Sequence, residues 1–347
     1  MQKVKIAFVD FWDNFDKEGF VCTRVLARHF DVEIMADANE ADYVFYSVNG
    51  DSHWFLPPEK IKIFYTGEAV TPDFNACDYA IGFDWLTFGD RYLRLPNYYA
   101  TPYYRHQTER FENRLATPLS DEQLRDLARN RAFCSFVVSN GKGHPLRYKL
   151  FEALSTYRKV DSGGRWHNNV GGPVADKITF ESNHKFSLAC ENSRIPGYTT
   201  EKIIEAFAAN TVPVYWGDPE IKRIFNPKAF IDVSDYPTTD ALIKKIKALD
   251  HDEEAYISML QEQPLQDIAQ HSLTTQTKEV ERFMLRIVGQ PIPQAMRRNR
   301  DFWGKRYHQR ERELIIKSQK DWRTLLKERM KQRMPFKMKP APRSKPI

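Results

Sequence analysis

The sequence predicts an α/β protein made of two Rossmann-like domains that face a cleft, followed by a basic amphipathic helical tail. Short strand-like runs alternate with helical stretches over residues 1–120, and the alternation begins again over residues 121–290. This order is typical of doubly wound, mostly parallel sheets. The chain also has 347 residues, 41% of them hydrophobic, which exceeds what one core usually organises. Residues 291–347 are left as the tail.

The first domain begins with a buried strand, KVKIAFVDFW. A helical stretch from Phe20 to Phe30 follows, and four further runs predict strands: DVEIMA, DYVFYSV, KIKIFYTGE and YAIGF. Residues 99–131 are polar and basic, and Pro102 and Pro118 are expected to interrupt regular structure there. We interpret them as a connection between the domains.

The second domain repeats the pattern. Strands are predicted at FCSFVVSN, at the end of KITFESNHKFSLACEN and at VPVYWG, with helices at PLRYKLFEALSTY and TTEKIIEAFAANT. Three helical stretches follow, over residues 240–249, 253–261 and 276–288. The repetition indicates a second Rossmann-like unit.

The sequence shows no segment suited to membrane crossing or export. No apolar run approaches the roughly 20 residues that a spanning helix needs, and the N-terminal residues lack the apolar core of a secretory signal. We therefore expect a cytoplasmic protein. The four cysteines show no C-x-x-C spacing, so neither a disulfide framework nor a zinc site is expected.

The positive charge of the chain is concentrated in the tail. Residues 291–347 hold 18 Lys and Arg against 5 Asp and Glu, a formal charge of +13, so the total of +6 leaves −7 for residues 1–290. No nucleic-acid partner is therefore expected. A basic amphipathic helix in the tail can lie on an anionic membrane, which would make the protein peripheral on the inner membrane. Alternatively, the helix can dock on the protein itself or on a second subunit. Both alternatives stay open for the apolar stripe, which comprises Leu314, Ile315, Trp322, Leu325, Leu326 and Met330.

The segment from Phe186 to Val233 holds the candidate binding residues. It reads as strand, loop, helix and strand in quick succession, and in open α/β sheets ligands bind beyond the carboxyl ends of the strands. Thr199 or Thr200 is a candidate N-cap for a helix that begins near Glu201, where unpaired N–H groups would suit a diphosphate. Lys202 would add a positive charge.

Fixed cations of this kind can stabilise the negative charge that grows on a departing diphosphate. A divalent metal is the alternative, and the only Asp-x-Asp in the sequence is Asp250-His251-Asp252, which lies between two charged helical stretches. We interpret that motif as solvated surface. No metal site and no required cofactor are therefore expected, and a divalent ion would at most stimulate the protein.

Three segments of the sequence are ENSRIPGYTTEKIIEAF, VPVYWGDP and FNPKAFIDV. Together they resemble the donor-binding signature of the alpha-1,3/4-fucosyltransferase family, and of its bacterial members in particular. The resemblance extends upstream to FYTGEAVTPDFNACDYAIGFD, to DRYLRLPNYY, and to SFVVSNGKGHPLRYKLFEAL with SGGR. It therefore covers most of residues 60–233.

The resemblance implies a GT-B fold and an inverting glycosyltransferase. In that family fucose moves from GDP-beta-L-fucose to a hydroxyl of N-acetylglucosamine, so the expected acceptor is an N-acetyllactosamine-type glycan, such as a lipopolysaccharide glycan, with a Lewis-antigen-like product. The carboxylate of the family's Y-T-G-E-type motif acts as general base, and this role maps to Glu68. Ala69 follows it where bacterial relatives often carry Asn, which unsettles nearby acceptor contacts but leaves the base in place.

The resemblance also assigns the donor site. Arg147, in the segment HPLR, and Lys202 would hold the diphosphate. Asn192, Tyr198 and Glu201 would contact the phosphate, ribose or fucose portions of GDP-fucose.

Two alternatives to this function remain. One is a transferase that uses another nucleotide sugar, since cations recognise any diphosphate. The other is a non-catalytic glycan-binding or membrane-binding protein on the same fold. The presence of Glu68, Arg147 and Lys202 argues against the second alternative, because a decayed enzyme need not keep them.

Overall fold

The computed structural model describes residues 1–298 and 301–332, with side chains described up to Ser318 and at Thr324 in the last helix. Residues 1–297 form one compact unit, and a second unit begins at Arg298. The boundary of the tail therefore falls after Arg297 and not after Gln290.

The first sheet has six parallel strands in the order β2-β1-β3-β4-β5-β6. The central strands are buried on both faces, as parallel sheets covered by helices require, and Tyr46 pairs with Phe64 across β3 and β4. The sequence predicted five of these strands and missed the last, which has three residues. The strands are β1 (Lys3–Val9), β2 (Asp31–Ile34), β3 (Tyr43–Tyr46), β4 (Ile61–Tyr65), β5 (Tyr79–Gly82) and β6 (Tyr92–Arg94).

The second sheet has five parallel strands in the order β11-β10-β9-β7-β8. All seven residues of its central strand β9 are buried. Two parallel sheets with helical crossovers confirm the predicted pair of Rossmann-like units. The strands are β7 (Ala132–Phe136), β8 (Val160–Ser162), β9 (His184–Cys190), β10 (Val212–Trp216) and β11 (Ile231–Asp232).

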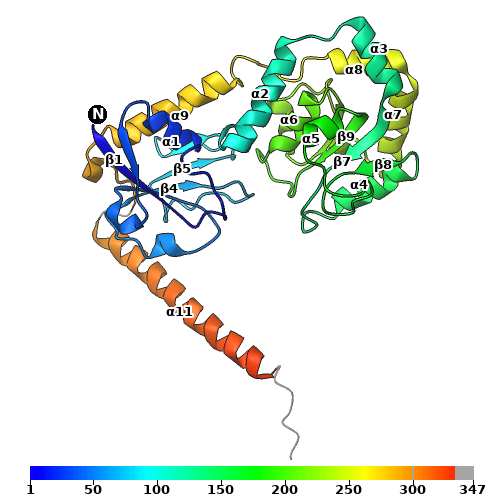
Figure 1. Cartoon of the computed structure of the whole chain (residues 1–347). Coiled ribbons are helices and arrows are strands. Elements are labelled where there is room, and N and C mark those ends of the chain that lie inside the picture. The colour runs from blue at the N-terminus through cyan, green and yellow to red at the C-terminus, as the bar shows by residue number, and fades with distance from the viewer. Residues whose placement is uncertain (299–300, 333–347) are drawn as a thin grey trace, which may run out of the picture. The chain divides into compact units, whose positions relative to one another are not determined.

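Helices connect and cover the strands of both sheets (Figure 1). The α-helices of the compact unit are α1 (Val21–Leu26), α2 (Pro102–Ala116), α3 (Asp121–Asn130), α4 (Leu146–Ser155), α5 (Lys177–Glu181), α6 (Glu201–Ala208), α7 (Thr239–His251), α8 (Glu253–Gln261), α9 (Leu273–Val288) and α10 (Ile292–Ala295). Short 3₁₀ turns complete it: η1 (Ala38–Glu40), η2 (Ser52–Trp54), η3 (Asn97–Tyr99), η4 (Ile221–Arg223) and η5 (Val233–Asp235).

The stretch over residues 99–131, which we interpreted as a connection between the domains, connects the two sheets through helices α2 and α3. Pro102 begins α2, where its missing N–H costs nothing. Ser120 caps α3 in a reciprocal pair of hydrogen bonds with Gln123. The sequence did not predict α2 because most of the residues that it buries are polar, namely Arg105, Gln107 and Thr108. Only Phe111 is apolar among the fully buried residues, and it packs near Phe207 of α6.

Helix α9 follows the second sheet in sequence but packs against the first. Its residues Val280 and Met284 share one hydrophobic core with Val25 of α1, and Figure 1 shows the two helices side by side. The apolar stripe of α9 therefore completes the first unit, although the sequence placed this stretch within residues 121–290.

The residues after α9 also belong to the compact unit. The hydroxyl of Tyr79 donates to the carbonyl of Ala295 at 2.7 Å. Arg297 forms an ion pair with Asp90 at 2.7 Å. These contacts explain why the predicted tail separates only after Arg297.

The second unit contains one long helix, α11 (Phe302–Gln332). Trp303 is 74% exposed and Leu314 is 57% exposed, which agrees with an apolar stripe on its first half. The remaining apolar residues predicted for the stripe lie outside the described side chains: Trp322, Leu325, Leu326 and Met330. Across the described parts of the chain, no helix combines the length and the apolar content that a membrane crossing requires.

Candidate active site

A buried carboxylate organises the loop between β9 and α6. Glu191 directly follows β9 and has no exposed surface. Its carboxylate accepts hydrogen bonds from the backbone N–H of Thr200 at 2.7 Å, from the hydroxyl of Thr200 at 2.6 Å and from Nζ of Lys202 at 3.0 Å. A buried charge needs such partners, so Glu191 holds the first turn of α6 against the end of β9.

Lys202 lies in the centre of this arrangement. Its Nζ also donates to the hydroxyl of Thr200 at 2.7 Å and to Oε1 of Glu201 at 3.2 Å. Burial alone would lower the pKa of Lys202, but Glu191 and Glu201 outweigh it and raise that pKa well above its ordinary value. Lys202 therefore stays protonated and carries a positive charge at the start of α6.

Helix α6 begins at Glu201, as the sequence predicted, and Thr200 occupies the N-cap position. The hydroxyl of Thr200, however, bonds Glu191 and not the helix amides. Thr200 is therefore the N-cap residue, as predicted, but its hydroxyl bonds the buried carboxylate in place of a helix amide.

Arg147 brings a second cation to the carboxyl edge of this sheet. It lies in the first turn of α4 and is 2% exposed, and its Nη1 donates to Oδ1 of Asn192 at 2.7 Å. Burial lowers the pKa of Arg147, with Cys190 and Glu191 opposing that shift. Within the described residues its buried Nε has no hydrogen-bond partner. Arg147 thus places a buried guanidinium, held by Asn192, at the carboxyl edge of this sheet.

The loop that precedes α6 is held rigidly by a second buried carboxylate. Asp218 accepts from the N–H of Gly197 at 2.8 Å and from the hydroxyl of Thr199 at 2.9 Å. Burial raises the pKa of Asp218. Gly197 has a φ of +82°, and a Cβ there would meet the carbonyl oxygen of Phe83 at 2.5 Å. Only glycine fits this close approach.

Tyr198 connects this loop to the first sheet. Its ring is 3% exposed and packs edge-on against Phe83, with 5.1 Å between ring centroids. Its hydroxyl donates to the carbonyl of Gly67 at 3.3 Å. Burial, together with Glu191 and Glu68, raises the pKa of Tyr198, so the hydroxyl stays protonated and can donate.

Glu68 is the residue after Gly67, in the loop that follows β4 at the carboxyl edge of the first sheet. Its side chain is exposed, while its backbone N–H donates to the hydroxyl of Thr66 at 3.1 Å. An exposed carboxylate on a fixed backbone is available to a hydroxyl from solution.

The structure thus brings the predicted donor residues together around Glu191. They come from α4, from the loop after β9 and from the start of α6, which meet because the carboxyl ends of parallel strands share one edge. The bond between Tyr198 and Gly67 links them to the loop of Glu68. The predicted donor residues are Arg147, Asn192, Tyr198, Glu201 and Lys202.

Sequence reasoning missed the two carboxylates that hold the site, Glu191 and Asp218. Each stands immediately or almost immediately after an apolar strand, in the strings ACEN and YWGDP. An acidic residue at such a position is a usable signal, because it lies at the ligand edge of the sheet.

A further charged cluster borders α6. Nζ of Lys177 lies 2.6 Å from Glu205 and 3.8 Å from Glu181. Burial raises the pKa of Glu181 to about 7, although Lys177 opposes the shift. Its Oε1 accepts from the hydroxyl of Ser187 at 2.8 Å.

No group of three or more His, Cys, Asp or Glu that could hold a metal occurs among the described residues. The Asp-x-Asp motif was interpreted as solvated surface, and this is wrong for Asp250. Its carboxylate is almost fully buried and pairs with Lys185 at 2.7 Å and Arg158 at 2.7 Å. Burial would raise the pKa of Asp250, but these hydrogen bonds hold it below its ordinary value. Asp252 caps α8.

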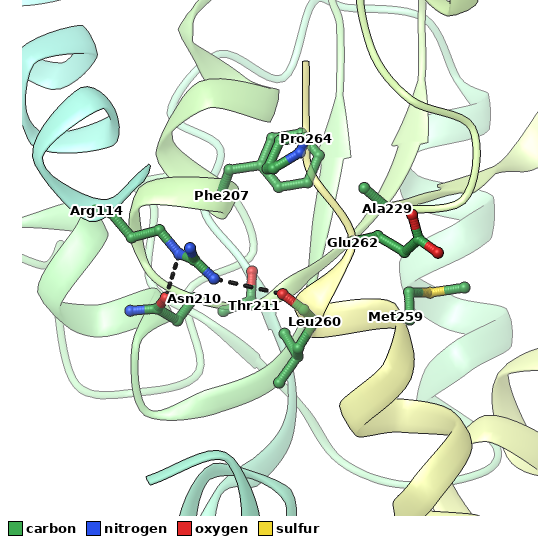
Figure 2. A pocket seen from close by; sticks show the side chains of 9 residues that line it. All are labelled: Arg114, Phe207, Asn210, Thr211, Ala229, Met259, Leu260, Glu262 and Pro264. Carbon is green, nitrogen blue, oxygen red and sulfur yellow. Dashed lines mark hydrogen bonds between the residues drawn. The ribbon is translucent and has the colours of Figure 1, made fainter. Parts of the chain in front are cut away.

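A small pocket lies beside the end of α6 (Figure 2), and none of the predicted donor residues lines it. Arg114 crosses it, donating from Nε to Oδ1 of Asn210 at 2.5 Å and from Nη2 to the carbonyl of Leu260 at 3.4 Å. Its volume is about 10 Å³, which is at most the space of one water molecule. We therefore assign it no substrate.

Two family models match the chain. "Alpha-(1,3)-fucosyltransferase FucT N-terminal domain" matches residues 6–101, and "Glycosyltransferase family 10 (fucosyltransferase) C-term" matches residues 127–284. The first match covers the sheet that carries Glu68, and the second covers the predicted donor residues around Glu191.

Two relatives are similar to this chain over part of their own length. "Alpha-(1,3)-fucosyltransferase FucT" of Helicobacter pylori is 36% identical over 291 residues, which are 76% of this chain and 60% of that protein. The human "3-galactosyl-N-acetylglucosaminide 4-alpha-L-fucosyltransferase FUT3" is 34% identical over 136 residues, which are 38% of this chain and 37% of that protein. The chain therefore spans less than two thirds of the length of either relative.

Two solved structures are similar to this chain over a larger share of both chains. A crystal structure of an alpha1,3-fucosyltransferase superposes with a TM-score of 0.71 and 32% identity, covering 84% of this chain and 92% of that one. A crystal structure of an alpha1,3-fucosyltransferase with GDP-fucose gives a TM-score of 0.68 and 32% identity, covering 82% of this chain and 91% of that one.

Proposed function

Because this chain belongs to the glycosyltransferase family 10 fucosyltransferases, we propose that it moves L-fucose from GDP-beta-L-fucose to an N-acetylglucosamine hydroxyl. One observation carries the proposal. Two cations, Arg147 and Lys202, lie at the carboxyl edge of the second sheet. In a loop at the same edge, the hydroxyl of Tyr198 donates to the carbonyl of Gly67, the residue before Glu68.

The departing diphosphate is the first demand of this chemistry. When the bond between the fucose anomeric carbon and the phosphate oxygen breaks, negative charge grows on GDP. We propose that Arg147 supplies its guanidinium charge here, and that Lys202 exchanges its 3.2 Å contact with Glu201 for a contact with a phosphate oxygen. Fixed cations of this kind need no reorganisation at the moment of transfer.

The acceptor hydroxyl is the second demand. Its oxygen forms the new bond to the anomeric carbon while its proton passes to the carboxylate of Glu68. Attack from the face opposite the phosphate gives an alpha-L-fucoside in one displacement, with inversion. The exposure of Glu68 beyond β4 supports this role, because the base must reach a hydroxyl of a separate sugar.

The donor is supported by similarity to the structure of an alpha1,3-fucosyltransferase with GDP-fucose. The acceptor follows from the relatives, whose names describe transfer to galactosyl-N-acetylglucosaminides. We propose an N-acetyllactosamine-type glycan and an alpha-1,3 linkage. The reaction needs no metal, since Arg147 and Lys202 supply the cationic charge.

The basic helix α11 is proposed to hold the protein on an anionic membrane surface. Its first half exposes Phe302, Trp303 and Leu314, and residues 291–347 carry a formal charge of +13. Apolar side chains and surrounding Lys and Arg are the two contributions that interfacial helices use.

The test measures GDP release from GDP-fucose in the presence of N-acetyllactosamine, with and without EDTA. Wild type should release GDP only with acceptor and should be insensitive to EDTA. Glu68→Ala should lose at least about 10²-fold in kcat, the usual contribution of a positioned base, and should still bind GDP-fucose.

Glu40→Ala is the matched control. Glu40 is exposed on the same domain but precedes β3, at the opposite edge of the sheet, and its loss should leave turnover unchanged. Near-normal transfer by Glu68→Ala would remove Glu68 from the base role. Release of UDP from a UDP-sugar, without release of GDP from GDP-fucose, would favour another donor. No release of nucleoside diphosphate from any donor would favour a binding protein.

A further inference from the structure

The carbonyl of Gly67 receives hydrogen bonds from both halves of the compact unit. Nδ2 of Asn97 donates to it at 2.8 Å, and the hydroxyl of Tyr198 donates to it at 3.3 Å. Asn97 lies at the start of η3, after β6 of the first sheet, whereas Tyr198 lies in the loop after β9 of the second. A Cβ on residue 67 would meet Nδ2 of Asn97 at 3.1 Å, so the absence of a side chain lets the amide approach closely.

The orientation of the Asn97 amide is set by a second bond. Its Oδ1 accepts from the hydroxyl of Tyr65 at 2.7 Å. Tyr65 is the buried last residue of β4, and Asn97 itself is 6% exposed. Because a hydroxyl hydrogen points at Oδ1 and a carbonyl accepts from Nδ2, the two groups dictate which way the amide lies.

The same peptide group is held at its other end. The carbonyl of Gly67 and the N–H of Glu68 belong to one planar peptide unit. That N–H donates to the hydroxyl of Thr66 at 3.1 Å, and Thr66 is buried. Its oxygen and its hydrogen are both bonded, so rotation of the peptide plane would break these hydrogen bonds, and they restrict the position of the Cα of Glu68.

We propose that Asn97 is a positioning residue for Glu68, and that Tyr198 makes this position depend on the donor loop. Asn97 touches neither donor nor acceptor in this account. It fixes the peptide from which the carboxylate extends, and Tyr198 adds a bond whose donor is carried by the loop that Asp218 and Glu191 hold in place. The inference rests on the proposed function, since it assumes that Glu68 is the base.

The size of the effect follows from the geometry of proton transfer. A general base must lie within hydrogen-bond reach of the proton that it removes, and a displacement of about 1 Å can cost about 10²-fold in rate. A loosened Gly67 peptide should therefore lower kcat and leave the separate donor site intact.

The variant that tests this most directly is Asn97→Asp. It keeps the shape of the side chain and an oxygen for the hydroxyl of Tyr65, but it sets a carboxylate oxygen against the carbonyl of Gly67. We expect kcat to fall by about 10- to 100-fold, while the Kd for GDP-fucose changes by less than about 2-fold. The added negative charge should also move the acid limb of the kcat/KM pH profile upward, because a like charge raises the pKa of a nearby carboxylate.

A purely structural role would give a different result. Asn183→Asp is the matched control, because Asn183 also donates through Nδ2 to a backbone carbonyl, that of Thr179, at 3.0 Å. It directly precedes β9, at the opposite edge of the second sheet from the predicted donor residues. We expect this variant to lower the melting temperature with kcat and the acid limb unchanged.

The outcomes separate this inference from the proposed function. Wild-type kcat and an unmoved acid limb in Asn97→Asp, together with an inactive Glu68→Ala, would overturn the positioning role and leave the function standing. Full transfer by Glu68→Ala would remove the base and the positioning role together. Should Asn97→Asp not fold, Tyr65→Phe replaces it, since it frees the amide of Asn97. A lower kcat at unchanged GDP-fucose affinity then supports the inference, and an unchanged kcat overturns it.

Discussion

Lys202 and Glu191 form an ion pair at 3.0 Å that joins the first turn of α6 to the end of β9. Glu191 is fully buried, and its other hydrogen bonds go to the N–H and hydroxyl of Thr200. The carboxylate therefore has a structural task and a functional one. It fixes the loop before α6, and it holds the cation that we propose for the diphosphate.

We expect Glu191→Gln to destabilise the protein and to weaken donor binding. Removing one partner of a buried pair typically costs about 3–5 kcal/mol, and Lys202 would keep only its weaker contacts. Urea unfolding should show a loss on this scale, and calorimetric titration should show weaker GDP binding. Glu254→Gln, which breaks an exposed pair with Arg125, should change neither measurement appreciably. Equal effects of the two variants would contradict the role of Glu191.

We expect Gly197→Ala to weaken GDP-fucose binding by about 10-fold or more. The backbone at Gly197 has a φ of +82°, and the new methyl group would lie 2.5 Å from the carbonyl oxygen of Phe83, so the loop must shift. Gly89→Ala is the control, because Gly89 also has a positive φ, of +54°, but meets nothing within 4 Å. Both variants carry the backbone strain of about 1–2 kcal/mol, so a difference in GDP-fucose Kd isolates the clash. Equal Kd values would show that the loop tolerates the methyl group.

The pH dependence of stability should contain a term from Glu181. Its pKa is about 7 in the folded protein against an ordinary value of 4.5. Between these pH values the folded chain holds a proton that the unfolded chain has released, so stability falls as pH rises from about 4.5 to about 7 and stays lower above that. The full effect is about 3 kcal/mol.

Glu181→Gln should remove this term, because the amide stays neutral at every pH. Its stability relative to wild type should rise between pH 5 and pH 8 in urea unfolding experiments. Glu18→Gln, at an exposed position, should show no such rise. A difference between Glu181→Gln and wild type that is constant with pH would contradict the raised pKa.

Deletion of residues 298–347 should abolish sedimentation with vesicles of anionic lipid and leave turnover of a soluble acceptor unchanged. The deletion begins at Arg298 because residues up to Arg297 pack on the first sheet. Neutral vesicles provide the control, since the proposed contact is partly electrostatic. Undiminished vesicle binding by the truncated protein would place the membrane contact elsewhere. Loss of turnover would indicate that the tail docks on the protein itself.

Much of the fold could be predicted from the sequence, because long buried strands and amphipathic helices leave periodic patterns. Strands as short as β6 and β11 leave too few residues for such a pattern. Helix α2 escaped prediction because three of its four buried residues are polar, so it leaves no apolar stripe in the sequence. The position of α9 depended on a partner, α1, that lies about 250 residues earlier in the chain.

The sequence by itself determined the two parallel α/β units, and its local motifs, through their family resemblance, predicted the residues of the candidate site: Glu68, Arg147, Asn192, Tyr198, Glu201 and Lys202. These features are encoded in short stretches, since hydrophobic periodicity and loop motifs act over a few residues. Only the tertiary structure decided which groups hold them, namely Glu191 for Lys202, Asp218 for Gly197 and Asn97 for Gly67. A buried polar group must find its partner wherever the packed chain supplies one, and no local pattern records that partner.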